Sequence, residues 1–360
     1  MSRHDRPARF AVIGAGWRAQ FHIRMAQAAP DRLECTAALA RRPQAREELR
    51  RQSAVPVVDT VEDLLATYPD YVIACVSWPA MPQVVEDLVA RGVKVLAETP
   101  PAPDLDGLRR LWHAVGSTGL VQVAEQYMLM PGHASRAEVI RRGVIGRPAF
   151  VEVASTHMYH AVSMMRTFLG TGTEEAEVTA SRLTAPLVDP LSFTGWRASA
   201  PSKDMSTTIA TLDFGDGRGG LYVFVDNQWW NPLLARRLVV RGDKGEIVDD
   251  SVTYLAGEDV VRSALSYRRL GIDMNLEGNE LDTVSFNGQV VYRNPWRGTR
   301  LSEDDIAVAS FLEMTGQWAR GEGPDPYPLR YACQDHYLSL VMEESIRSGR
   351  AVRASEEVWA

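Results

Sequence analysis

The feature that most constrains the fold is an alternation, from Ala8 to Glu125, of short apolar runs with longer segments of helical periodicity. Such alternation is typical of βαβ units, whose strands run parallel and carry helices on both faces. The sequence predicts helices between these strands, for example Met81–Arg91 and Leu105–Val115. The expected strands are Phe10–Ile13, Leu33–Leu39, Val55–Val58, Tyr71–Val76, Val93–Ala97 and Leu120–Ala124. We therefore expect an α/β domain with a doubly wound parallel sheet.

The pattern changes after a helix expected at Ala134–Arg142. Period-two runs, typical of half-buried strands, follow at Ala149–Ala154, Thr207–Phe214, Gly220–Asp226, Arg237–Arg241 and Gly288–Tyr292. Helical stretches at Asp304–Arg320 and Arg330–Ser348 come last. A chain of 360 residues is longer than one hydrophobic core usually supports. We expect two domains, residues 1–126 and residues 127–360, the second an α+β domain with an open, mainly antiparallel sheet.

Composition excludes several classes of function. The formal net charge is −7 and no basic run occurs, which argues against nucleic acid as a partner. No apolar stretch is long enough for a membrane span, and the charged start does not resemble a targeting signal. The three cysteines, Cys35, Cys75 and Cys333, lack metal-ligand spacing and read as reduced, buried thiols. These features favour a cytoplasmic protein.

A glycine motif follows the first expected strand. Gly14-Ala15-Gly16-Trp17-Arg18-Ala19 has the form G-x-G-x-x-A at a strand-to-helix turn. In a Rossmann fold the first glycine allows the tight turn, the second lets a pyrophosphate approach, and the small last residue lets the helix pack on the strand. The diphosphate then binds the N–H groups at the helix N-terminus. We predict dinucleotide binding, with Trp17 and Arg18 beside the cofactor; a purely structural glycine turn is the alternative.

The end of the second strand bears on the choice of cofactor. Enzymes selective for NAD usually carry Asp or Glu there, whereas this chain has Ala38-Leu39-Ala40-Arg41-Arg42. Either arginine suits the 2′-phosphate of NADP, through a forked, charge-assisted contact. The residues thus favour NADP over NAD, and the alternative is that Arg41 and Arg42 are solvated.

Several segments together resemble the glucose-fructose oxidoreductase, inositol dehydrogenase and rhizopine-catabolism family, known as Gfo/Idh/MocA. The resemblance rests on Gly14-Ala15-Gly16 followed by His22, on the run from Gly92 to Pro100, and on Arg142-Gly143-Val144-Ile145-Gly146-Arg147-Pro148. Arg241-Gly242-Asp243-Lys244-Gly245-Glu246 and the segment from Ser345 to Arg350 are also similar to family landmarks. The resemblance implies an NAD(P)-dependent oxidoreductase, a carbohydrate-like small-molecule substrate and a homo-oligomer, a dimer or a tetramer.

Two active-site landmarks of that family are altered. Its dehydrogenases carry Glu-Lys-Pro after the fifth strand, where this chain has Glu98-Thr99-Pro100, and a hydroxyl replaces neither the charge nor the proton transfer of an ammonium group. Ser163 stands where the family has an aspartate three residues after a histidine. The resemblance further implies a cofactor site that includes Ser77, Glu98, Thr99, Pro100 and Gln126.

His160 is the candidate acid/base, since histidine titrates in the range useful for moving a hydroxyl proton. Tyr159 is its neighbour in a Tyr-His pair that we place at a strand end, and a half-buried structural pair is the alternative. Tyr127 follows the last parallel strand, at the edge where open α/β sheets bind ligands. We expect the Tyr127 phenol to polarise a substrate oxygen; the alternative is that the ring packs at the junction between the two domains. Glu125 and Gln126 are expected near the nicotinamide.

Lysine is scarce, so a substitute for the missing family lysine is sought among three residues. Lys94 is expected to be solvated, Lys244 lies in a sheet turn, and Lys203 is expected to pair with Asp204. His157 and His160 lack the third ligand that a zinc site needs, so no metal is predicted. The candidate substrate-binding residues are His157, Trp196, Arg197 and Trp230. The alternative is that the tryptophans pack in the core.

Three functions stay open at this stage. The leading one is an NAD(P)-dependent dehydrogenase or reductase acting on a sugar, cyclitol or related polyol. The second is a lyase or glycosidase that retains its cofactor and oxidises a ring carbon transiently. The third is an inactive dinucleotide-binding protein.

Overall fold

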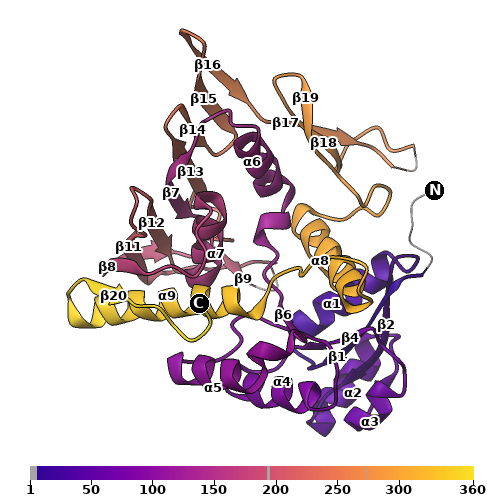
Figure 1. Ribbon diagram of the computed structural model, residues 1–360. Helices are drawn as coiled ribbons and strands as arrows, with labels where there is room; N and C mark the ends of the chain where they lie inside the picture. Colours follow the sequence, from indigo (N-terminus) through magenta and orange to yellow (C-terminus); the bar gives the residue numbers. More distant parts are fainter. Residues whose placement is uncertain (1–5, 193–194, 273) are drawn as a thin grey trace.

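The computed structural model describes residues 6–192, 195–272 and 274–360 (Figure 1). Its first part is a parallel sheet in the order β3-β2-β1-β4-β5-β6. The strands are β1 (Ala8–Ile13), β2 (Leu33–Leu39), β3 (Val57–Val58), β4 (Tyr71–Ala74), β5 (Val95–Ala97) and β6 (Val121–Val123). The helices are α1 (Trp17–Ala28), α2 (Pro43–Gln52), α3 (Val61–Leu65), α4 (Met81–Val89) and α5 (Leu105–Val115), with single turns η1 (Trp78–Ala80), η2 (Gly116–Thr118) and η3 (Tyr127–Leu129). The predicted doubly wound fold is confirmed.

The strands of this sheet are apolar without alternation because both faces are covered. Phe10, Ala11 and Val12 of β1 are completely buried, in two separate clusters of side chains on the two faces. The edge strand β3 is shorter than predicted. Pro56 lies within the predicted run and has no N–H to give to a ladder, although its carbonyl accepts from the Ala38 N–H at 2.8 Å.

The second part contains a sheet of nine described strands in the order β16-β15-β14-β13-β7-β12-β11-β8-β20. They are β7 (Pro148–Ala154), β8 (Ala176–Val188), β11 (Ser202–Asp213), β12 (Gly219–Val225), β13 (Arg237–Gly242), β14 (Gly245–Val248), β15 (Ser251–Ala256), β16 (Asp259–Ala264) and β20 (Val352–Ala354). Among the strands described, β7 and β12 pair in parallel and the other neighbours are antiparallel. The predicted open antiparallel sheet is confirmed.

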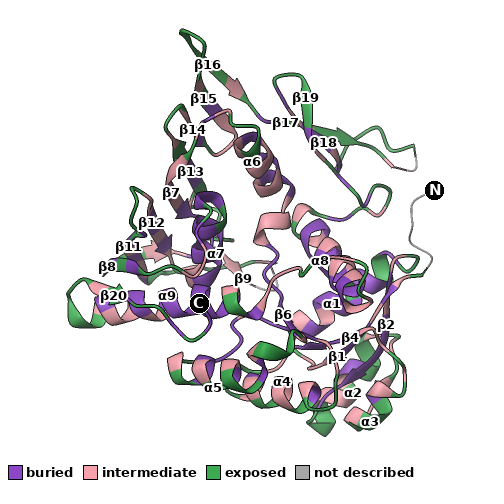
Figure 2. Cartoon of the chain, viewed as in Figure 1, coloured by how far each residue is buried: buried purple, intermediate pink, exposed green. Residues whose placement is uncertain are grey.

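Helices cover one face of this sheet. These are α7 (Met158–Leu169) and α9 (Leu329–Ser348), and α9 also packs against α5 and β6 of the first part. Helix α6 (Pro131–Arg141) packs instead against the strands at residues 280–286 and 289–293. Figure 2 shows many green, exposed residues within β8, β15 and β16. Strand β8 begins with alternate buried and exposed residues, as a strand covered on one face requires. Smaller pairings join β9 (Leu191–Ser192) to β10 (Gly195–Trp196), and β17 (Ser266–Leu270), β18 (Glu280–Phe286) and β19 (Gln289–Arg293).

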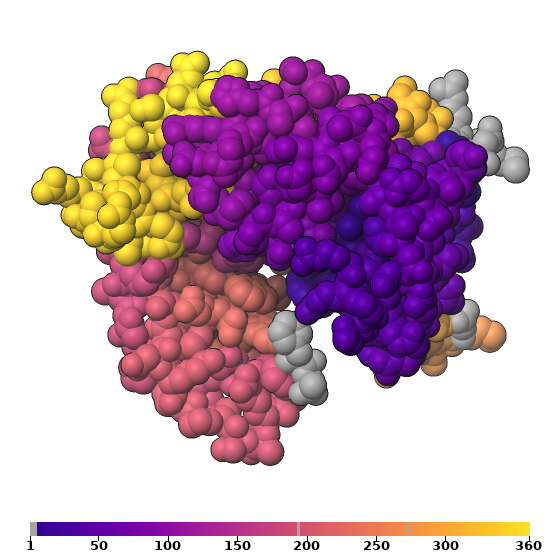
Figure 3. Space-filling view, turned by 90° about the horizontal axis from the view of Figure 1, so that it is seen from below, coloured from indigo at the N-terminus to yellow at the C-terminus, as the bar shows by residue number. Residues whose placement is uncertain are grey.

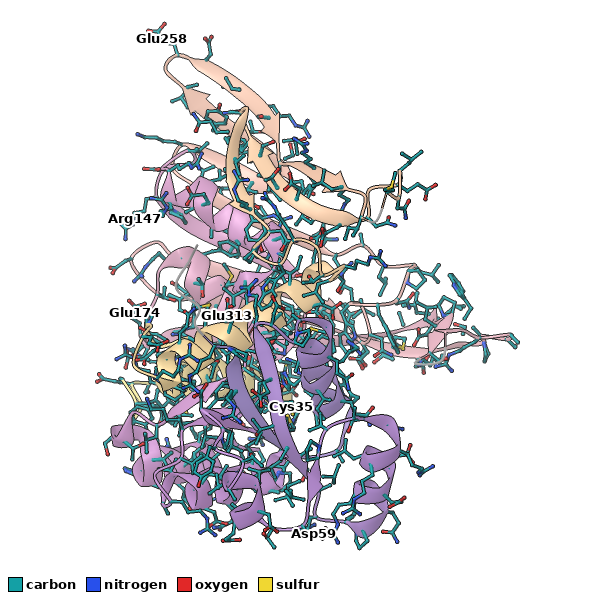
Figure 4. The ribbon with its side chains drawn as sticks, turned by 90° about the vertical axis from the view of Figure 1, so that its right-hand side faces the viewer. Cys35, Asp59, Arg147, Glu174, Glu258 and Glu313 are labelled. Carbon is teal, nitrogen blue, oxygen red and sulfur yellow. The ribbon has the colours of Figure 1, made fainter. Side chains whose placement is uncertain are left out.

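Helix α8 (Glu303–Ala319) returns to the first part of the molecule, although it follows the whole second sheet in sequence. It packs against α1 and β1, and its Ile306 and Leu312 belong to the same buried cluster as Phe10. Polar contacts hold it there: Arg32 Nη2 lies 2.6 Å from Glu313 Oε2, near the centre of the view in Figure 4. The predicted boundary between two domains at residue 126 stays a prediction. Helix α8 lies after that boundary in sequence but packs on the first part of the molecule.

Two sequence expectations are corrected. Tyr159 and His160 lie in the first turn of α7, not at a strand end, because the apolar run from Met158 to Leu169 packs against β7 and α9 as a helix. Lys94 is not solvated, since its Nζ donates to the carbonyl of Ala319 at 2.8 Å, at the C-terminal end of α8. None of the described helices is long and apolar enough to cross a membrane.

Candidate active site

A cleft of about 1420 Å³ runs between the first sheet and the second part of the molecule. Figure 3 shows the hollow where the indigo N-terminal residues face the pink and orange strands. Most residues predicted for the site line it, namely Gly14, Gly16, Trp17, Arg18, Arg41, Arg42, Ser77, Glu98, Thr99, Gln126, Tyr127, His157, Tyr159, His160 and Trp230. Pro100, Trp196 and Arg197 are absent from its described lining.

The glycine turn forms the floor of the cleft. Gly14 has φ of 140°, and a Cβ there would lie 2.1 Å from the carbonyl oxygen of Cys75, so no other residue fits. Gly16 has nothing within 4 Å of the position that its Cβ would occupy. It is also the N-cap of α1 and gives that helix no side-chain cap. The first N–H groups of α1 therefore face open space, which fits the pyrophosphate of a dinucleotide.

One end of the cleft is basic. Arg41 and Arg42 follow β2, are exposed and line the cleft. Neither has an ion-pair or hydrogen-bond partner among the residues that the structure describes. Asp59, which also lines this end, is already engaged by Arg46 Nη1 at 2.6 Å. In a Rossmann fold the adenosine ribose binds at the end of β2, so we call this the adenosine end.

The opposite end lies where β5 and β6 finish, and we call it the reacting end. Arg18 Nε donates to Glu98 Oε1 at 2.7 Å, and Arg18 Nη2 donates to Gln126 Oε1 at 3.2 Å. His22 Nε2 contacts the same Glu98 oxygen at 2.6 Å. Burial favours the neutral carboxyl, yet Arg18 and His22 outweigh it and hold the pKa of Glu98 at about 2. Glu98 is therefore a permanent anion that fixes the guanidinium of Arg18.

His160 is held by a buried carboxylate. Its Nδ1 lies 2.5 Å from Glu125 Oε2, and the other oxygen of Glu125 accepts from the Tyr127 N–H at 3.3 Å. Tyr127 and Tyr159 lie close to the imidazole, with ring centroids 4.6 Å and 4.5 Å away. A carboxylate on one nitrogen fixes the orientation of the ring and leaves Nε2 for another partner. The arrangement is that of a general acid/base with an orienting group.

The altered landmarks have local roles. The Thr99 hydroxyl hydrogen-bonds the Tyr159 phenol and so lowers the pKa of Tyr159, although burial dominates and raises it. Ser163 Oγ donates to the His160 carbonyl at 2.9 Å within α7. No lysine occurs in the described lining of the cleft. The expected ion pair of Lys203 with Asp204 is not formed, because Lys203 Nζ lies 3.5 Å from Asp189 Oδ2 instead.

Aromatic side chains of the second part line the reacting end opposite His160. His157 lies 5.2 Å from the Trp229 ring and 5.0 Å from the His160 ring, measured between centroids. Burial lowers the pKa of His157 to about 3, so the ring is neutral at physiological pH. Trp196 is 75% exposed, on β10 outside the cleft, and Arg197 Nε donates to the Leu191 carbonyl at 2.9 Å.

The sequence analysis missed several residues that the cleft brings in. The role of Glu125 as the partner of His160 left no sequence signal, because 35 residues separate them. Asp304 enters from the first turn of α8, and its side chain hydrogen-bonds Gln126. Trp78 and Asn227 also line the cleft. The position of Trp78 after β4, at the carboxyl edge of the sheet, was a usable signal.

One group of metal-type ligands occurs among the described residues, formed by His22, Cys75 and Glu98 with ligand atoms within 4.8 Å of one another. Arg18 already donates to the Glu98 oxygen. Burial also raises the pKa of the Cys75 thiol well above its usual value, which disfavours a thiolate ligand. These residues therefore form an ion-paired cluster beneath the glycine turn, in which Glu98 contacts Arg18 and His22.

Comparison with known proteins agrees with this geometry. Residues 8–126 match the model of the oxidoreductase family with an NAD-binding Rossmann fold, Gfo/Idh/MocA. No curated protein matches the chain in sequence. Residues 8–126 thus match this oxidoreductase family, and the resemblance indicated by the motifs is confirmed for that part of the chain.

Solved structures share the whole fold. A myo-inositol dehydrogenase from Corynebacterium glutamicum is 17% identical, with 98% of this chain and 100% of that chain covered and a TM-score of 0.66. The WlbA dehydrogenase from Bordetella pertussis, solved with NADH and UDP-GlcNAcA, is 17% identical, with 98% and 99% covered and a TM-score of 0.64. An oxidoreductase from Agrobacterium radiobacter, solved with NAD+, L-tartaric acid and magnesium, is 15% identical, with 96% and 98% covered and a TM-score of 0.67.

Proposed function

We propose that this chain is an NAD(P)-dependent oxidoreductase that transfers a hydride to or from a sugar, cyclitol or related polyol. The observation that carries the proposal is one continuous cleft that begins at the open N-terminus of α1 and ends at the Glu125–His160 pair. The similar structures whose names specify an inositol dehydrogenase, or a dehydrogenase with a nucleotide sugar, support this substrate class.

The chain's own residues account for the proton. His160 takes the hydroxyl proton of a substrate alcohol, or returns it to a carbonyl, while Glu125 stabilises the imidazolium that forms. Burial raises the pKa of Tyr127 to about 12, so this phenol stays protonated and serves as a hydrogen-bond donor to the same oxygen. The bound nicotinamide supplies the hydride acceptor or donor. Gly14, Gly16, Trp17, Arg18, Ser77, Glu98, Thr99 and Gln126 are the proposed cofactor contacts that line the cleft.

NADP is the proposed cofactor of choice, because Arg41 and Arg42 are exposed at the adenosine end and form no ion pair within the described part of the chain. The test has two parts. Freshly purified protein is denatured and any released dinucleotide is identified by mass, while an emptied sample is titrated with NAD and NADP. Binding followed by a change in absorbance at the nicotinamide band with a panel of polyols supports the proposal. Failure of both dinucleotides to bind contradicts it.

A cofactor-retaining lyase or glycosidase is the second candidate. Thr99 stands beside Tyr159 where the family has lysine, which favours chemistry that differs from ordinary dehydrogenases. In that case purified protein retains dinucleotide that added cofactor does not exchange, and substrate is cleaved with no net change in absorbance. An inactive dinucleotide-binding protein predicts exchangeable binding with neither reaction.

We also propose a homo-oligomer formed through the uncovered face of the nine-stranded sheet. Leu183 of β8, Leu255 of β15 and Val260 of β16 are exposed large apolar residues of that sheet. Light scattering after size-exclusion chromatography tests this expectation, since a monomer at micromolar concentration contradicts it.

A further inference from the structure

The two ends of the cleft carry opposite charge. At the adenosine end Arg41 and Arg42 are unpaired. At the reacting end one guanidinium, Arg18, lies among three carboxyl groups, which belong to Glu98, Glu125 and Asp304. The first two are engaged, by Arg18 and by His160. Asp304 is the exception, because no basic side chain in the described part of the chain forms an ion pair with it.

Asp304 belongs to the reacting end by its contacts. Its side chain hydrogen-bonds Gln126, whose amide oxygen accepts from Arg18, and its charge acts on Arg18 and His160. It lines the cleft and is solvent-accessible. The capping box of α8, formed by Ser302 and Asp305, does not use it. Asp304 is thus not part of the capping box, and its side chain lines the cleft.

A dinucleotide changes charge only at one end when it is reduced. The nicotinamide ring carries one positive charge in the oxidised form and none in the reduced form, whereas the phosphates and adenosine are unchanged. Because the adenosine ribose binds at the end of β2, the nicotinamide reaches the ends of β5 and β6. The ring whose charge changes therefore lies at the acidic end.

From this juxtaposition we infer that the cleft discriminates between redox states, binding the oxidised dinucleotide more tightly than the reduced one, with Asp304 as the residue that sets the difference. The inference rests on the proposed function. A single carboxylate near a unit positive charge, in a partly solvated and salt-screened site, changes affinity by about three- to tenfold. By linkage, the bound reduced form is a correspondingly stronger hydride donor than the free one.

The experiment measures dissociation constants of NADP+ and NADPH, and of NAD+ and NADH, by calorimetry on emptied full-length protein. The pH is 8, because desolvation raises the pKa of Asp304 and the carboxyl must be ionised. Asp304→Asn is compared with the wild type and with Glu303→Gln. The control removes one charge from the same helical turn, at a residue that is absent from the described cleft lining and pairs with Arg269.

We expect Asp304→Asn to raise the dissociation constant of the oxidised dinucleotide about three- to tenfold and to leave that of the reduced form within twofold. Glu303→Gln is expected to change neither dissociation constant. Equal changes in both forms, or a wild type that prefers the reduced form, overturn the inference while the proposed function survives. If no dinucleotide binds the wild type, the proposed function itself is wrong and the inference falls with it.

Discussion

The adenosine end and the reacting end of the cleft are built in different ways. The first consists of the glycine turn and two arginines, all within Gly14–Arg42, and each residue follows directly from the end of a strand. The second collects Glu98, Glu125, His160, Trp229 and Asp304, which come from five separate segments. The comparison teaches that the binding of a dinucleotide is a local property of this chain, whereas the chemistry performed on it is a tertiary one.

The largest expected effect comes from removing the acid/base pair, which distinguishes catalysis at the reacting end from dinucleotide binding at the adenosine end. His160→Ala is expected to lower kcat by about a hundredfold to ten-thousandfold, the usual contribution of general acid–base catalysis, with dinucleotide affinity nearly unchanged. Glu125→Gln is expected to lower kcat less, because the imidazole keeps a hydrogen-bond partner but loses the charge that stabilises its protonated form. Steady-state kinetics and calorimetry measure the two quantities. Ser163→Ala is the matched control, since among the described residues its hydroxyl donates to the His160 backbone carbonyl and to no side chain. A His160→Ala variant of full activity would falsify the assignment.

The adenosine end is probed by removing its cations. The Arg41→Ala/Arg42→Ala double variant is expected to bind NADP about ten- to a hundredfold more weakly, because hydrogen bonds to a charged phosphate are worth about 1.5–3 kcal/mol. NAD has no 2′-phosphate, so its affinity in the same variant serves as the control. If both dinucleotides weaken equally, the arginines act on the shared pyrophosphate and the preference for NADP is wrong.

The buried histidines of the molecule make its stability depend on pH. Burial lowers the pKa of His133 and His157 to about 3, that of His336 to about 4, and also that of His22. Below about pH 6.5 these histidines bind protons in the unfolded chain but stay neutral in the folded chain. The free energy of unfolding therefore decreases as the pH is lowered. Asp335, whose pKa burial raises to about 6, and Asp304, whose pKa burial also raises, oppose this effect in part.

Urea unfolding between pH 7 and pH 5 is expected to show a falling midpoint, with a net uptake of up to roughly three protons. His336→Phe is expected to reduce that dependence by about one proton, because a neutral ring fills the same site between Trp78 and Tyr159. Stability that is flat or rising over this interval contradicts the neutral, buried state of these rings.

The smallest expected effect concerns the aromatic wall. Trp229→Ala is expected to raise KM for a polyol substrate by about three- to tenfold with little change in kcat, since a stacking surface contributes about 0.5–1.5 kcal/mol beyond its area. Trp196→Ala is the control, because that side chain is 75% exposed and outside the cleft. Equal effects of the two substitutions would mean that the residues 195–200 approach the substrate after all.

Much of the fold could be predicted because its signals are local. The run Leu33–Leu39 and the helix Leu105–Val115 have the predicted bounds, since both are apolar patterns with clear ends. Strand β8 was missed although its first residues alternate between buried and exposed, because most of its second half faces solvent and offers no buried face to detect. Helix α7 was missed because a helix buried on nearly every side carries no polar stripe.

The candidate site divides in the same way. Gly14 and Gly16 could be assigned from the sequence, because both belong to one short motif at the end of a strand. At Gly14 the sharp turn admits only glycine, whereas Gly16 leaves open space at the start of α1. Trp196 and Trp230 could not be ranked, since both are tryptophans in turn-rich segments and only the path of the chain places one of them in the cleft.

By itself, the sequence determined the parallel sheet, the dinucleotide turn and the residues available for chemistry, because the βαβ alternation and the glycine motif are patterns within short stretches of the chain. Only the tertiary structure decided that Glu125 holds His160, that Arg18 neutralises Glu98, and that α8 brings Asp304 back across the molecule. The physical reason is that a pairing between distant segments is fixed by how the buried faces of helices and strands pack, and no local pattern encodes which two faces meet.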